Sequence, residues 1–207
     1  MDGSKVTLSP AELALAADPS VMLMKNSVIE AVYDLFGRLA ERQSRSVIGL
    51  RPFFGEAFDN PPKISRGERY HGLPYVMLDH PRRFSGNDIF AIRTLFWWGY
   101  FFSVTLHLKG AWLERFSDRV VGGRDWLAGR GYHVSTGRHE WEHHFGDDNY
   151  LPVSSISATD WEDACSRGGF TRLAVRFPVS RFNDMEDILA EAFEDIVGWL
   201  ASDGAMG

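Results

Sequence analysis

A histidine- and glutamate-rich segment at residues 139–143 is the sharpest chemical motif in this 207-residue chain. It runs His139, Glu140, Trp141, Glu142, His143. On a helix, the two histidines would lie four residues apart on one face, where they can bind zinc. Glu140 would then act as the base that activates a metal-bound water. This arrangement predicts a zinc-dependent hydrolase.

The five residues resemble the H-E-x-x-H motif of the zincin metallopeptidases. In the gluzincin branch of that family, the third zinc ligand is a glutamate further downstream on another helix. Glu162 stands at a matching distance in this chain. The resemblance therefore implies a zinc site of His139, His143 and Glu162, with Glu140 as the catalytic base, and it covers only these residues.

The surroundings of the motif favour a different interpretation. Gly137 and Gly146 bracket a segment of only about two helical turns. If residues 138–145 form a strand instead, His139 and His143 are about 13 Å apart, too far to share one ion. A solvated surface strand or loop is the alternative to the zinc site. The conformation of residues 138–145 stays open from the sequence.

A long apolar stretch at residues 73–109 must position any such chemistry. Residues 100–109 alternate, with Phe102 and Val104 on one face and His107 and Lys109 on the other. This period of two is typical of a strand with one buried face. Residues 73–80 and 89–96 are apolar enough for two further strands, and Gly99 suits a tight turn. The stretch predicts the central antiparallel hairpin of a sheet.

Basic and histidine side chains gather around this hairpin. If the strands are neighbours, they form a concavity that can receive a small anionic ligand. The candidate ligand-binding residues are His80, Arg82, Arg83, His107 and Lys109. The alternative is that the arginines form ordinary surface ion pairs and that His107 is half-exposed.

A third hypothesis concerns the aromatic residues at the turn of the hairpin. An exposed patch there would favour protein interaction, including formation of a homo-oligomer. The residues are Trp97, Trp98, Tyr100 and Phe101.

Composition limits the classes of protein. The net charge is −6, which argues against broad nucleic-acid binding. Arg93, His107 and Lys109 interrupt the apolar stretch, so it does not predict a membrane span. The single cysteine, Cys165, excludes an internal disulfide. Together with an amino terminus unlike a signal peptide, it favours a cytoplasmic protein.

Capping residues and helical periodicity predict helices towards both ends of the chain. Ser9, Pro10 and Glu12 form a capping box. Helices are expected at residues 10–17, 18–45, 159–168 and 183–201, and one further strand at 170–177. Residues 46–72 are expected to form an irregular connection, and residues 122–131 to be poor in regular structure.

These elements predict a single α+β domain over residues 1–207, with frayed ends at 1–8 and 202–207. Its mainly antiparallel sheet of about four to six strands would carry the amino- and carboxy-terminal helices on one face. The sequence leaves open whether the protein is an enzyme. The favoured function is that of a non-enzymatic protein that binds a small anionic ligand beside the hairpin, with the zinc hydrolase and the interaction module as alternatives.

Overall fold

The central hairpin forms as the alternation predicts. β3 (Asp88–Trp97) and β4 (Phe101–Lys109) are paired from Ile89 opposite Lys109 to Trp97 opposite Phe101. Gly99 adopts a φ of 78° in the turn between them, a conformation that glycine tolerates without strain. The hairpin therefore fixes which side chains face each side of the sheet.

The computed structural model describes residues 6–202, which form one α+β domain around a seven-stranded antiparallel sheet. The strand order is β1-β2-β3-β4-β7-β5-β6. The remaining strands are β1 (Lys63–Tyr70), β2 (Leu73–Ser85), β5 (His133–Ser135), β6 (Tyr150–Pro152) and β7 (Phe170–Pro178).

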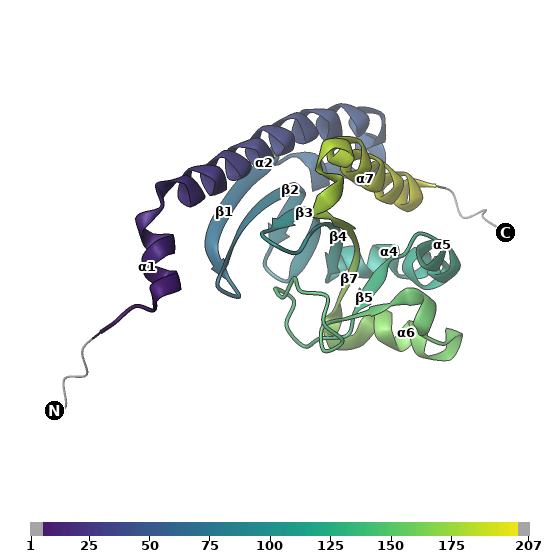
Figure 1. Cartoon of the computed structure of the whole chain (residues 1–207). Coiled ribbons are helices and arrows are strands. Elements are labelled where there is room, and N and C mark those ends of the chain that lie inside the picture. Colours follow the sequence, from purple (N-terminus) through teal and green to yellow (C-terminus); the bar gives the residue numbers. More distant parts are fainter. Residues whose placement is uncertain (1–5, 203–207) are drawn as a thin grey trace.

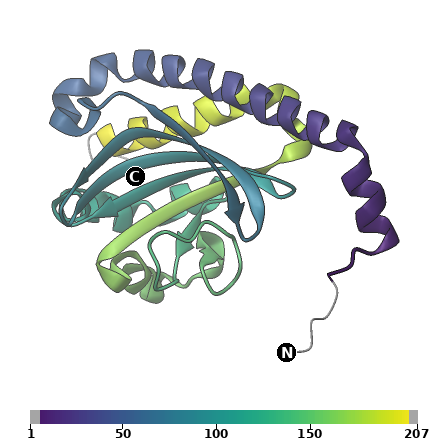
Figure 2. The same ribbon diagram turned by 90° about the vertical axis from the view of Figure 1, so that its left-hand side faces the viewer.

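Two long helices cover one face of the curved sheet (Figures 1 and 2). They are α2 (Pro19–Ser46) and α7 (Met185–Ala201), and they lie side by side. Arg38 of α2 pairs with Glu186 of α7 at 2.6 Å, which joins the two helices at their exposed edge. The expected placement of the amino- and carboxy-terminal helices on one face is confirmed.

The main core lies between these helices and the sheet. Phe36 and Phe193 come from the helices, whereas Phe102, Val104 and Leu106 come from β4, and each is at most 1% exposed. Trp112 and Phe116 of α4 (Ala111–Gly122) and Trp161 of α6 (Ala158–Ser166) belong to the same core. One continuous apolar cluster therefore supports the sheet from this side.

The amino-terminal end of the helical layer is an exception. α1 (Pro10–Ala17) begins at the predicted capping box and contributes no buried residue. Burial in α2 begins only at Ile29. α1 and the first turns of α2 therefore form an arm that reaches beyond the sheet (Figures 1 and 2).

Several local predictions needed correction. Residues 46–72 contain short helical turns and the edge strand β1, and residues 122–131 contain α5 (Arg124–Gly129). The short turns are Ile48–Leu50, Arg51–Phe54 and Gly55–Phe58, and three others are Val153–Ser155, Arg167–Gly169 and Val179–Asp184. Glycine and proline content alone misled the prediction, because pairing with β2 and packing on the core order both regions.

The predicted fraying falls largely outside the described residues, since only 6–8 and 202 of those ranges are described. Residues 6–8 have no regular structure, and the last residue of α7 is Ala201. Among the described residues, the helices are too short or too polar to cross a membrane.

Candidate functional site

The sheet face opposite the long helices is polar at its centre. The antiparallel register places Asp79, Arg93 and Thr105 in one row across β2, β3 and β4. The next row places Ala91, His107 and Arg172 side by side across β3, β4 and β7. We call the surface formed by these six residues and Lys109 the polar face.

A loop of residues 136–149, which we call the strap, covers the polar face between β5 and β6. Tyr70 fixes its middle, because its hydroxyl accepts hydrogen bonds from the backbone N–H groups of His143 and His144 at 2.7 and 3.0 Å. The Asn149 amide donates to the carbonyl of His144 at 2.6 Å and thus holds the end of the strap. The strap is an ordered cover even though it has no regular secondary structure.

Two of the cations on the polar face are paired with carboxylates. Arg93 donates to both oxygens of Asp79, at 2.7 and 2.9 Å. Lys109 contacts both oxygens of Glu140 on the strap, at 3.1 and 3.0 Å. Each cation therefore has one carboxylate partner, which offsets part of the cost of removing it from water.

Arg172 differs from these pairs. It is 1% exposed, and its hydrogen bonds go to the Ser135 hydroxyl at 2.7 Å, the Asn149 side-chain oxygen at 2.8 Å and the carbonyl of Glu142. Among the described residues, no carboxylate lies within 4.0 Å of its guanidinium, and its Nε has no hydrogen-bond partner. Arginine is rarely buried this deeply without an anion. Three cations and two carboxylates therefore leave one positive charge on this face uncompensated.

A small cavity lies between the polar face and the strap. Its volume is about 10 Å³, enough for one water-sized species. The lining residues are Phe84, Ala91, Arg93, Thr105, His107, Glu140, His143 and Arg172. The Nε2 atom of His107 is buried there without a hydrogen-bond partner and is 3.7 Å from Glu140 Oε2.

Both histidines of this cavity are neutral at pH 7. Burial, with Arg172, Arg93 and Lys109 nearby, lowers the pKa of His107 to about 3. Burial and the charge of Arg93 hold the pKa of His143 well below its usual value. The contact of His107 with Glu140 is therefore not a salt bridge. A neutral imidazole with its proton on Nε2 can donate a hydrogen bond into the cavity.

The structure divides the predicted ligand-binding residues. His107 and Lys109 lie on the polar face, and His107 is buried instead of half-exposed. His80 faces the helices, where its ring stacks on Phe193 at 5.9 Å. Arg82 and Arg83 bind the Pro61 carbonyl and Glu56 instead. The polar face therefore contains two of the five predicted residues, and only His107 lines the cavity.

The predicted zinc ligands do not converge. In the described structure, residues 138–145 form no helix. His139 is exposed, whereas the Nε2 atom of His143 lies 3.3 Å from Arg93. Glu162 is exposed on α6, and these three residues form no common ligand cluster among the described residues. The geometric basis of the resemblance, two histidines on one helix face, is therefore missing.

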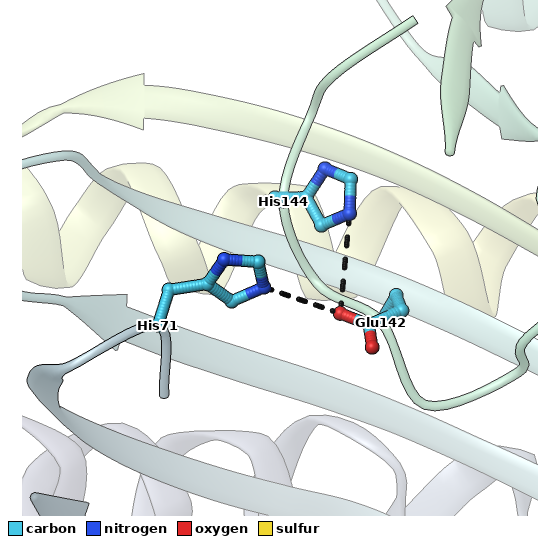
Figure 3. A group of neighbouring side chains, drawn as sticks. All are labelled: His71, Glu142 and His144. Atoms are coloured by element: carbon cyan, nitrogen blue, oxygen red, sulfur yellow. Dashed lines mark hydrogen bonds and ion pairs between the residues drawn. The ribbon is translucent and has the colours of Figure 1, made fainter. Parts of the chain in front are cut away.

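The same segment does take part in another cluster, formed by His71, Glu142 and His144 (Figure 3). One ligand atom from each residue lies within 4.8 Å of the others. His71 Nε2 is 3.5 Å from Glu142 Oε2, and His144 Nε2 is 3.9 Å from the same oxygen. Sequence spacing missed this group because His71 comes from the turn between β1 and β2.

The tip of the central hairpin is not an exposed aromatic surface. Trp97 and Phe101 are 4% and 6% exposed, and Trp98 is only partly exposed. Tyr100 is exposed, but its ring stacks on Trp97 at 3.9 Å. The proposed patch is therefore largely internal, because the rings pack against one another and against Phe145 of the strap.

Comparison with known proteins gives no further information. No protein-family model matches the chain, and no curated protein or solved structure shows significant similarity to it.

Proposed function

We propose that the protein binds a small anion on the polar face, beneath the strap. The observation that carries the proposal is Arg172, a buried guanidinium that has no carboxylate partner among the described residues and that lines a cavity. An anion there would supply the missing negative charge and would accept hydrogen bonds from Arg172 Nε and His107 Nε2. Arg93 and His143 would complete the lining.

The size of the cavity limits the ligand. A volume of about 10 Å³ corresponds to one water molecule or one ion of chloride size. Glu140 also lines this cavity, but its charge is engaged by Lys109. A larger anion, such as a metabolite carboxylate, requires residues 140–143 of the strap to move away. We therefore take chloride as the first probe.

Thermal unfolding at constant ionic strength tests the proposal. Chloride replaces gluconate, which is too large for the closed cavity, and the midpoint should rise with chloride concentration because binding stabilises the folded state. Arg172→Gln should abolish this rise, and His107→Leu should reduce it. Arg83→Ala, which removes a surface arginine paired with Glu56, serves as the control and should behave like the wild type.

Two results contradict anion binding. One is an unchanged midpoint in the wild type across the anion series. The other is an Arg172→Gln variant that is folded and still responds like the wild type. His107→Leu gives a second measurement if Arg172→Gln fails to fold.

The predicted cytoplasmic location, which rests on the single cysteine and the amino terminus, stays a prediction.

A second candidate function rests on the arm formed by α1 and the first turns of α2. Exposed apolar residues lie on the arm and just before it, and they are Val6, Leu8, Leu13, Leu15, Met22, Leu23, Met24 and Val28. Each of these eight side chains is at least 39% exposed, and a standard interface covers about 800 Å² on each partner. Exposed apolar side chains gathered in this number often mark an interaction surface. We propose that a second copy of the chain covers the arm.

Light scattering during gel filtration tests this pairing. The wild type should elute with the mass of a dimer, and Leu23→Glu should convert it to a monomer. Ile48→Glu is the matched control, because Ile48 is 64% exposed but lies outside the arm. A monomeric wild type, or a dimer that survives Leu23→Glu, contradicts the candidate.

A further inference from the structure

We propose that His71, Glu142 and His144 form a binding site for a divalent transition-metal ion, with zinc as the representative ion, that ties the strap to the turn between β1 and β2. This inference is independent of anion binding, because none of the three residues lines the cavity on the polar face. It also differs from the zincin arrangement, which uses His139 and His143.

The distances suit a metal ion after a small adjustment. In a tetrahedral zinc site with bonds near 2.0–2.1 Å, neighbouring ligand atoms are about 3.4 Å apart. The two distances to Glu142 Oε2 are 3.5 and 3.9 Å, and all three ligand atoms lie within 4.8 Å. Side-chain rotations that move these ligand atoms by about 1 Å would bring them to the distances of a tetrahedral site.

The donor set selects a class of metal. Two imidazole nitrogens and one carboxylate suit zinc and related first-row ions, whereas calcium and magnesium prefer oxygen ligands. The side chains of His71 and Glu142 are 52% and 39% exposed, so water can reach the remaining coordination position. The site is thus an open one with three protein ligands.

Local structure directs two of these ligands towards each other. His71 has a φ of 48°, the left-handed conformation of a tight hairpin turn, which a histidine adopts at a cost. The Tyr70 hydroxyl donates a hydrogen bond to Glu142 Oε2 at 3.0 Å, and its oxygen accepts one from the backbone N–H of His144. One hydroxyl therefore orients both the carboxylate and the strap, as outer-shell groups of metal sites do.

His144, the third ligand, must carry its imidazole proton on Nδ1 instead of Nε2 before it can bind the ion. Gly146 N–H donates to His144 Nδ1 at 3.2 Å, which places the imidazole proton on Nε2. Metal binding at Nε2 requires the proton on Nδ1, where Asp148 Oδ1 lies 3.8 Å away and can accept it. A Cβ at position 146 would lie 2.7 Å from that oxygen, so a larger residue there would displace the Asp148 carboxylate. The turn at 146–148 therefore adjusts when the ion binds.

Calorimetric titration with zinc tests the site on chelator-treated protein without a histidine tag, and cobalt absorption reports the ligand geometry. The wild type should bind one zinc ion per chain. His71→Asn should weaken binding at least tenfold, because asparagine accepts the left-handed turn but does not replace the imidazole. Tyr70→Phe should weaken it about 10- to 100-fold by releasing the carboxylate.

His139→Gln is the matched control, since His139 is an exposed histidine of the same strap outside the cluster. It should bind zinc like the wild type. Absence of zinc and cobalt binding by the wild type overturns the proposal, as does unchanged affinity in folded His71→Asn. A loss in His139→Gln equal to that in His71→Asn also overturns it, because it indicates nonspecific binding to a histidine-rich surface.

Discussion

The two faces of the sheet are buried by different means. Beneath the helices, β4 contributes Phe102, Val104, Leu106 and Leu108, which need only close packing. Beneath the strap, the same strand contributes Ser103, Thr105 and His107, each at most 8% exposed. Burying a charge is costly unless it is paired and hydrogen-bonded. Carboxylate pairing on this face stops at Arg172.

Truncating the helix-covered face should have the largest effect. Phe193 of α7 is fully buried and stacks on His80. Phe193→Ala should lower the free energy of unfolding by about 3–5 kcal/mol, because a large cavity remains in the core. Urea denaturation followed by tryptophan fluorescence measures the loss. If Phe193→Ala lost less stability than Trp141→Ala, a variant of the strap, the assignment of the main core to this face would be contradicted.

Breaking a pair on the polar face should cost somewhat less. Asp79→Asn leaves the charge of Arg93 without its carboxylate, and both side chains are only slightly exposed, at 12% and 14%. We expect a loss of about 3 kcal/mol in the free energy of unfolding. Adding Arg93→Gln should restore part of the stability, since the unpaired charge is then gone. Additive losses in the double variant would show that the two residues are not coupled.

Acid should destabilise the helix-covered face through His80. Burial and the charge of Arg51 lower its pKa from 6.5 to about 4 in the folded chain. Between these values the unfolded chain binds more protons, so stability is full above pH 6.5 and falls as the pH drops towards 4. His80→Phe should remove about 2–3 kcal/mol of this loss.

Denaturation of the wild type and of His80→Phe at pH 7.5 and 4.5 measures that difference. His139→Gln, which removes an exposed histidine, should keep the pH dependence of the wild type. Equal pH dependence in the wild type and His80→Phe would mean that His80 titrates normally.

The smallest effect should come from the outer surface of the strap. Trp141 is 48% exposed and contacts His107 and Phe84 through its ring. Trp141→Ala should change the free energy of unfolding by less than about 1 kcal/mol. Trp141→Ala should reduce the anion-dependent thermal shift more strongly than it reduces stability, because the ring covers Phe84 and His107 in the cavity wall. A loss similar to that of Phe193→Ala would make the strap part of the folding core.

Local sequence patterns predicted the helices and strands that are determined by their own residues. The alternation in 100–109 identified β4, and the capping box at Ser9 and Glu12 identified the start of α1. β1, β5 and β6 were missed, because the three-residue strands β5 and β6 are too short for a pattern and β1 is charged. β1 is ordered by pairing with the next strand, β2, and β5 by pairing with β6 and β7.

The site was predictable only in part for the same reason. The alternation placed His107 and Lys109 on the more polar face. Nothing in the sequence sets the register between β4 and β7, so Arg172 could not be placed beside His107. The pairing of His71 with the strap depends on a contact across 71 residues. Spacing within residues 139–143 suggested metal binding but pointed to the wrong geometry.

The charged edge strand β1 has a consequence for behaviour at high concentration. A free strand edge can recruit other chains into a growing sheet, which leads to aggregation. Exposed charges on β1 come from Lys63, Arg66, Glu68 and Arg69. A neighbouring molecule that added a strand there would have to remove these charged side chains from water. The charged edge at β1 therefore disfavours growth of the sheet by addition of another chain.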